Sequence, residues 1–249
     1  MIEFGRDMCG DAENALRREW LVTNGLGSYA GGTLAGANTR CYHGVLIAAL
    51  AAPVGRTLLV AKIDATAHRR GATYKLDTNE WADGSIEPLA YKLIESFRLD
   101  GTIPTWTYAL NEAQLVKRIW MAHGHHTTYI TYTHARGADP IELDLKALIT
   151  YRDHHASTKG DWMPAVTHSP TALRVETFDQ VPPYFVKIER GGTYTPIERW
   201  FHKFKHRVET ERGLDDVEDL YAAGQFHVTL QPGETIALVA STEEEASLD

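Results

Sequence analysis

Hydrophobic and polar residues alternate along most of the chain, and this period of two is typical of half-buried β-strands. The alternation is clearest in three consecutive segments, residues 113–121, 127–135 and 141–151. A stretch rich in turn-forming residues, 136–140, separates the last two segments. The pattern therefore predicts a mostly β protein whose strands are joined by turns.

Glycine-containing turns separate further segments with strand pattern. Gly191-Gly192 lies between residues 184–190 and 193–200. Because glycine tolerates the positive φ of a two-residue loop, we expect these segments to pair as a tight hairpin. A second turn is expected at residues 231–234, which contain Pro and Gly.

Helical periodicity is confined to two short segments, residues 12–18 and 215–221. About fourteen candidate strands, and no linker rich in Ser, Gly or Pro, favour one compact unit. We therefore expect an all-β fold over residues 1–249, a single large antiparallel β-sandwich, supersandwich-like, with few short helices. The acidic segment 242–249 is interpreted as a linker.

Composition narrows the classes of function. The chain has 43% hydrophobic and 23% charged residues, as in ordinary soluble globular proteins. Its net charge of -8 argues against a nucleic-acid or anionic-membrane partner, since both favour basic surfaces. The longest apolar run, 45–54, is about half of the roughly 20 residues that a membrane span needs. With no signal-peptide pattern and two cysteines, Cys9 and Cys41, we expect a cytoplasmic protein.

A glycine-rich segment, residues 25–36, invites a nucleotide-binding interpretation. Gly25-x-Gly27-x-x-Ala30 matches part of the dinucleotide fingerprint. However, Gly31-Gly32 would break the helix that must follow, and no acidic residue appears until Asp64. We therefore expect no cofactor and interpret the glycines as turns that let backbone segments approach closely.

Twelve histidines raise the question of a metal site. The densest group, residues 123–126, contains neither an HExxH motif nor a spaced Cys/His set, so we expect no metal. His154 follows Arg152 and Asp153 at the end of a predicted strand, and together they form a compact polar cluster. A structural salt bridge explains this cluster as well as a functional role does.

The motifs of nucleophilic catalysis are absent, because no Gly-x-Ser-x-Gly sequence and no reactive-cysteine signature occurs. Hydrolysis of a sugar bond needs two facing carboxylates. Asp144, Asp153, Asp161 and Glu198 are candidates, but their spacing pairs none of them. We therefore assign no catalytic residue.

Six tryptophans suggest carbohydrate binding, because flat rings with a polar edge suit the apolar faces of sugars. Trp81 and Trp162 lie in loop-like sequence and are candidate ligand-binding residues, to which Trp106 is added. Three others lie within strand patterns and are interpreted as core residues: Trp20, Trp120 and Trp200.

A substrate-binding cluster is predicted where two polar segments flank buried strands. The first segment contributes Asn38, Arg40, Tyr42 and His43, and the second contributes Arg152, Asp153 and His154. Arginine can hold sugar hydroxyls in a fixed fork, and tyrosine can stack on a sugar ring. In the structural alternative, Arg40 and Asp153 satisfy each other.

Longer stretches carry a family resemblance. Residues 19–30, EWLVTNGLGSYA, and 38–46, NTRCYHGVL, closely resemble the N-terminal domain of bacterial and archaeal glycogen debranching enzymes of the amylo-alpha-1,6-glucosidase type. The resemblance extends over essentially the whole chain. The further similar stretches are 54–62, 104–106, 117–121, 151–155 and 218–224.

The resemblance implies a role beside a catalytic domain. In that family a β-sandwich precedes a helical (α/α)6 barrel that holds the catalytic acids, and no barrel-like sequence is present here. It thus implies a non-catalytic domain of a glycoside hydrolase, which helps to bind α-glucan (glycogen, limit dextrin, maltooligosaccharides) and packs against the C-terminal catalytic domain. Two alternatives stay open: a freestanding mutarotase-like sugar epimerase using one His and one Glu, and a purely structural or dimerisation domain. A homo-oligomer is compatible with each.

Overall fold

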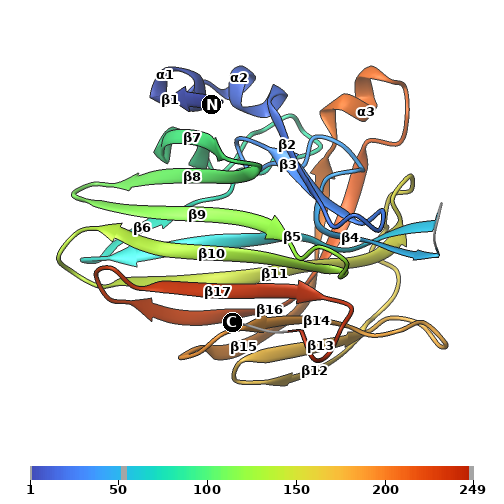
Figure 1. Cartoon of the computed structure of the whole chain (residues 1–249). Helices are drawn as coiled ribbons and strands as arrows, with labels where there is room; N and C mark the ends of the chain where they lie inside the picture. The colour runs from blue at the N-terminus through green and yellow to red at the C-terminus, as the bar shows by residue number, and fades with distance from the viewer. Residues whose placement is uncertain (1, 52–54, 247–249) are drawn as a thin grey trace.

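The computed structural model describes residues 2–51 and 55–246, which form two antiparallel sheets (Figure 1). The larger sheet has nine strands in the order β1-β7-β8-β9-β10-β17-β14-β13-β12. In chain order these are β1 (Glu3–Gly5), β7 (Ile94–Asp100), β8 (Ile103–Leu110), β9 (Ala113–Met121), β10 (Thr127–Arg136), β12 (Ala165–Ser169), β13 (Ala172–Glu176), β14 (Tyr184–Ile188) and β17 (Thr235–Ser241).

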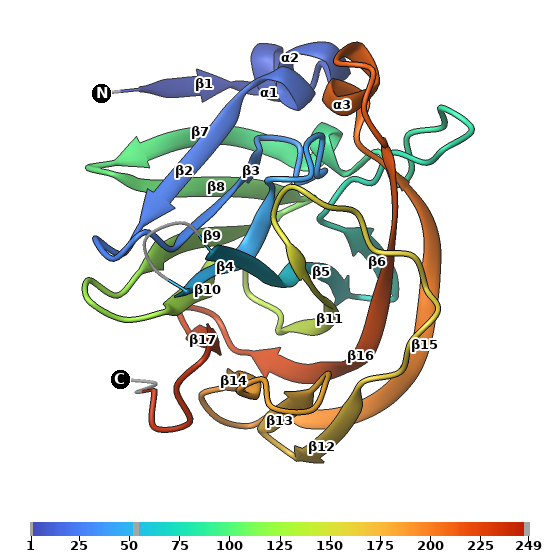
Figure 2. The same cartoon turned by 90° about the vertical axis from the view of Figure 1, so that its right-hand side faces the viewer.

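The second sheet has eight strands and packs against the first. Its order is β15-β16-β11-β5-β4-β3-β2, with β6 paired to β5. In chain order its strands are β2 (Glu19–Thr23), β3 (Tyr29–Thr33), β4 (Gly44–Ala51), β5 (Gly55–Arg69), β6 (Ala72–Lys75), β11 (Ile141–Asp153), β15 (Thr193–Lys205) and β16 (Val217–Leu230). Figure 2 shows β15 and β16 as long curved strands at one edge of this sheet.

Helices are few and short. They are α1 (Arg6–Cys9), α2 (Ala12–Arg17), α3 (Arg207–Glu211) and a 3-10 helix (Ala90–Leu93). The three α-helices lie at one end of the molecule, at the top of Figures 1 and 2. Strands hold 57% of the described residues and helices 8%, so the predicted all-β sandwich is confirmed. Within the described ranges, no helix has the length and apolar character that crossing a membrane requires.

Several predicted elements are found within a few residues of their expected bounds. The strands predicted at 113–121, 127–135 and 141–151 are β9, β10 and β11. The helix predicted at 12–18 is α2, whose N-terminus is capped by the Asp11 carboxylate accepting from Asn14 N at 2.8 Å. The apolar run 45–54 corresponds to β4, which is buried through Ala49, while residues 52–54 lie outside the described ranges.

The predicted hairpin around Gly191-Gly192 is wrong. β14 pairs with β13 and β17 in the nine-stranded sheet, whereas β15 pairs with β16 in the eight-stranded sheet. The two glycines therefore carry the chain from one sheet to the other, and Gly191 adopts a φ of 62°. The turn at residues 231–234 is present but also connects the two sheets, because it joins β16 to β17.

The helix predicted at residues 215–221 is also wrong. This segment contains the start of β16, which is hydrogen-bonded to β11 on one side and β15 on the other. Leu220 and Tyr221 are buried on opposite faces of the sheet, which requires a strand. Pairing with two distant strands thus overrides the local helical pattern, and the helix in this region is α3, residues 207–211.

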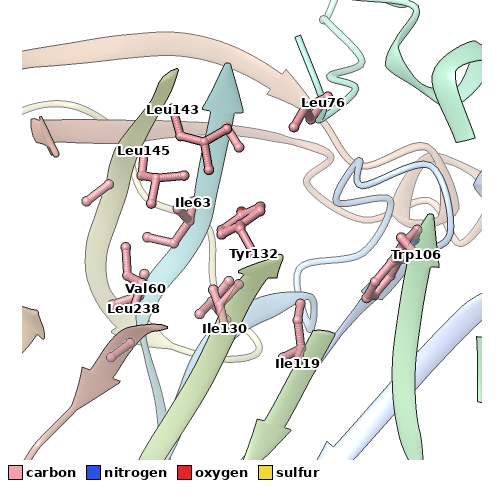
Figure 3. Close-up of a cluster of buried hydrophobic side chains, with 14 of the residues drawn as sticks. Val60, Ile63, Leu76, Trp106, Ile119, Ile130, Tyr132, Leu143, Leu145 and Leu238 are labelled. Carbon is pink, nitrogen blue, oxygen red and sulfur yellow. The ribbon is translucent and has the colours of Figure 1, made fainter. Parts of the chain in front are cut away.

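The main core fills the space between the sheets. Figure 3 shows part of it, with Ile63, Ile119, Tyr132 and Leu145 among the labelled side chains. Trp20 and Trp200 pack against this core as predicted. Trp120 does not, because it is partly exposed and stacks on Tyr129 with ring centroids 5.3 Å apart. A second, smaller cluster of buried residues contains Ile47, Leu58, Ala61, Leu148, Phe204, Leu220 and Ala222.

Candidate functional site

The outer face of the eight-stranded sheet, turned away from the other sheet, carries much of the polar chemistry. Along β11, Leu143, Leu145 and Ala147 point into the core between the sheets. Side chains of a strand alternate in direction, so Asp144 and Lys146 point to the outer face. The second, smaller cluster of buried residues lies farther along this same outer face. It includes Leu148, the next residue of β11 after Lys146 that points to this face.

A groove of about 580 Å³ lies on this face, and we call it the sheet groove. Three neighbouring strands form its floor, because Lys146 on β11 pairs in register with Asp64 on β5 and Gln225 on β16. The segment between β6 and the 3-10 helix forms part of its rim. The polar and aromatic lining residues considered as ligand contacts are Asp64, Asp144, Lys146, Gln225, Trp81, Phe201 and Phe204.

Aromatic rings form one wall of the sheet groove. Trp81 lies against Phe204 with ring centroids 4.9 Å apart, and its indole Nε1 donates to the carbonyl of Glu87 at 3.2 Å. The Lys146 ammonium lies 4.7 Å from the centroid of the Phe201 ring. Trp81 is half-buried, so a ligand in the groove can reach its ring.

The Asp64 carboxylate is held by cations from two strands. Its oxygens lie 3.1 Å from Lys62 Nζ and 3.8 Å from Lys146 Nζ, and Asn79 Nδ2 donates to it at 3.3 Å. Burial acts to raise the pKa of Asp64, but the charges of Lys62 and Lys146 and the hydrogen bonds outweigh it and lower that pKa. Asp64 is therefore ionised at neutral pH.

The Asp144 carboxylate lies between two imidazoles. His68 Nε2 is 3.1 Å from Oδ2, and His227 Nδ1 is 2.9 Å from Oδ1. The three residues come from the adjacent strands β5, β11 and β16. Both oxygens of Asp144 thus have fixed partners, and the carboxylate faces the sheet groove with its orientation held.

The two segments predicted to cluster do meet, at the other end of β11. Arg152 donates from Nη2 to the carbonyl oxygen of Cys41 at 2.8 Å. The Tyr42 ring lies edge-on to the ring of His154 with centroids 5.5 Å apart. Tyr42 Oη is 3.0 Å from Nδ1 of His155, a residue that the sequence prediction omitted.

Arg152 is committed to protein partners. It forms an ion pair with Glu218 at 2.6 Å, and the two side chains are 5% and 2% exposed. Burial raises the pKa of the Glu218 carboxyl, although the charge of Arg152 and its hydrogen bond act to lower it. Removing one member of a buried pair leaves an uncompensated charge. This geometry favours a structural role for Arg152.

His43 and Arg40 meet at Glu19 on β2. His43 is buried, with Nδ1 accepting from Thr39 N at 3.0 Å and Nε2 3.4 Å from Glu19. Arg40 Nε lies 2.5 Å from the same carboxylate, so the alternative pairing of Arg40 with Asp153 is wrong. The hydrogen bond from His43 is the largest cause of a Glu19 pKa lowered to about 2, helped by Arg40 and opposed by burial.

Three of the remaining predicted residues, Asn38, Trp106 and Trp162, do not line the sheet groove. Asn38 donates from Nδ2 to the carbonyl of Ala61 at 3.2 Å. Trp106 is buried in the core, and its Nε1 donates to the carbonyl of Leu34 at 2.9 Å. Trp162 is half-buried and packs edge-on against Trp200 with centroids 5.1 Å apart. Of the three tryptophans proposed as ligand contacts, Trp81 lines the sheet groove.

Sequence reasoning missed most of the sheet groove. From the sequence, Asp144 is an unpaired candidate acid, and nothing distinguishes Asp64, Lys146 and Gln225 from other polar residues. The available signal is that each is a polar residue alternating with apolar ones on a strand that is otherwise buried. What the sequence did not give was the strand order that brings β5, β11 and β16 side by side.

Comparison with known proteins identifies the family. The family model for the N-terminal region of glycogen debranching enzymes matches residues 18–237. The chain belongs to the glycogen debranching enzyme N-terminal family. The family region thus contains both the sheet groove and the predicted cluster, and it confirms the resemblance seen in the sequence.

The other comparisons add little. No curated protein matches the chain. Among solved structures, the crystal structure of a GalM/aldose epimerase homologue from C. elegans is similar, with 12% sequence identity and a TM-score of 0.38. That match covers 90% of this chain and 98% of the other.

Proposed function

We propose that this domain binds α-glucan in the sheet groove and presents it to the catalytic domain of a debranching enzyme. The observation that carries the proposal is the aromatic wall of Trp81 and Phe204 beside the oriented carboxylates of Asp64 and Asp144. Stacking on a sugar face together with hydrogen bonds to its hydroxyls is the combination that carbohydrate binding needs. Family membership supports glucan as the sugar.

The charge state of Asp64 supports binding rather than hydrolysis. A glycosidase of the usual kind needs one carboxyl group that stays protonated as general acid, which requires a raised pKa. The pKa of Asp64 is lowered instead, so this carboxyl does not meet that requirement. We therefore assign the domain no catalytic step and expect no glucose release from limit dextrin by this chain alone.

We further propose that the exposed edge strand β2 contacts the catalytic domain. β2 ends the order of the eight-stranded sheet, so one side of it has no strand partner in that order. Leu21 on this strand and Leu26 after it are exposed large apolar residues. Such residues on an open sheet edge favour contact with another domain.

Trp81→Ala tests glucan binding in the groove. We expect the variant to bind maltoheptaose about tenfold more weakly than the parent in isothermal titration calorimetry, since an aromatic stacking contact contributes on the order of 1 kcal/mol or more. Trp81→Phe keeps a flat ring and is expected to retain most of the affinity.

Trp162→Ala is the matched control, because Trp162 is also half-buried and packs on β15 but does not line the sheet groove. Its affinity for maltoheptaose is expected to equal that of the parent. Equal affinities for parent and Trp81→Ala, with both folded by thermal melting, would refute the groove as the binding site.

A further inference from the structure

The last residue of β11 and the two residues that follow it bring metal-ligating atoms together. Asp153, His154 and His155 each place one such atom within 4.8 Å of the other two. A turn causes this convergence, because His155 N donates to Asp153 Oδ1 at 2.8 Å and Ala156 N donates to the Asp153 carbonyl at 3.0 Å. The two imidazole ring centroids are 4.0 Å apart.

We propose that Asp153, His154 and His155 form a binding site for a divalent transition-metal ion, with Zn²⁺ as the ion it fits best. Two imidazole nitrogens and one carboxylate oxygen match the ligands that zinc takes in proteins. Calcium and magnesium prefer oxygen ligands throughout, so this donor set selects against them. Water would complete the coordination.

His154 supplies the second observation. Its side chain is 9% exposed, yet Nδ1 has no hydrogen-bond partner and lies 3.7 Å from Asp153 Oδ1. A buried polar atom without a hydrogen-bond partner lowers the stability of the folded protein, and a metal ion bound to Nδ1 would supply the missing interaction.

Two arginines near the site are paired with carboxylates. Arg152, which precedes Asp153 in the chain, is paired with Glu218 at 2.6 Å. Arg212, whose guanidinium lies 5.8 Å from the Tyr42 ring centroid, is paired with Glu209 at 2.8 Å. Arg56 donates to a backbone carbonyl, that of Gly27, at 2.7 Å. Asp153 itself is exposed and adds a negative charge.

The Tyr42 hydroxyl is a further oxygen beside these three residues. It lies 3.0 Å from His155 Nδ1. Coordination by the Tyr42 hydroxyl in place of a water would link the loop before β4 to the loop after β11.

The test is calorimetric titration of the untagged full chain with Zn²⁺, against a His154→Ala/His155→Ala variant. We expect one Zn²⁺ per chain for the parent and at least about a tenfold loss of affinity for the variant, the scale of effect seen when the support of a metal site is removed. His155→Ala alone is expected to show the same direction of change, and because His155 is exposed this variant should keep the parent's thermal stability.

His202→Ala is the matched control. His202 is also exposed and lies 3.0 Å from a carboxylate, that of Asp219, but it is not part of a converging set. Its variant is expected to bind Zn²⁺ as the parent does. The proposal is overturned if the parent binds no Zn²⁺, or if the double variant binds it with the parent's affinity and stoichiometry.

Discussion

Individual side chains decide which polar groups serve structure and which stay available to a ligand. Arg152 and His43 looked equivalent to Tyr42 in the sequence, but each is buried against a carboxylate, Glu218 or Glu19. The sequence could place these residues at strand ends, because polarity changes there. It could not identify their partners, which come from strands far away along the chain.

His206 makes stability depend on pH. It is buried, and burial, aided by Arg152, lowers its pKa to about 3. In the unfolded chain His206 titrates near 6.5, so below that pH the unfolded state binds a proton that the folded state does not. The stability should fall as pH decreases from about 6.5 towards 3.

Urea unfolding measures this effect. Between pH 7 and 5.5, His206 should account for a loss of about 1 kcal/mol in the free energy of unfolding. In a His206→Gln variant that share of the pH dependence should be absent. A variant whose stability varies with pH as the parent's does would show that His206 is not the group responsible.

At the scale of elements, regular alternation was enough to locate strands but not to pair them. β9, β10 and β11 were predicted closely because each shows a clean period of two and is followed by a turn or loop. β14 and β15 were wrongly paired, because a short glycine turn fits a hairpin as well as it fits a crossing between sheets. Residues 215–221 were wrongly predicted as a helix. β16, which begins in this segment, is buried on both faces, so its apolar and polar residues do not alternate.

Burial on both faces has a measurable consequence for β11. Leu148 is fully buried in the outer cluster, between the sheet groove and the end of the strand. Leu148→Ala should destabilise the protein by about 2–5 kcal/mol, the cost of a core truncation. Glu142→Ala on the same strand is the control, because Glu142 is exposed and should change stability by less than about 0.5 kcal/mol. Chemical denaturation of both variants checks this, and similar losses would contradict it.

The whole molecule has a core between two sheets, and the eight-stranded sheet also carries polar groups and a small apolar cluster on its outer face. The eight-stranded sheet carries, along a single strand, the carboxylate of Asp144 and the cation of Lys146 at one end and the Arg152 ion pair at the other. Leu148 and its apolar neighbours separate the two. The groove combines an aromatic wall with charged side chains, whereas Arg152 at the other end is paired with Glu218, which is why we place glucan in the groove.

A crystal structure of the chain soaked with maltoheptaose tests the glucan-binding account most directly. The account predicts glucose units in the sheet groove, with a sugar face stacked on Trp81 and hydroxyls within hydrogen-bond distance of Asp64 or Asp144. Glucan bound elsewhere, or a groove that stays free of sugar at concentrations that saturate binding in solution, would contradict it.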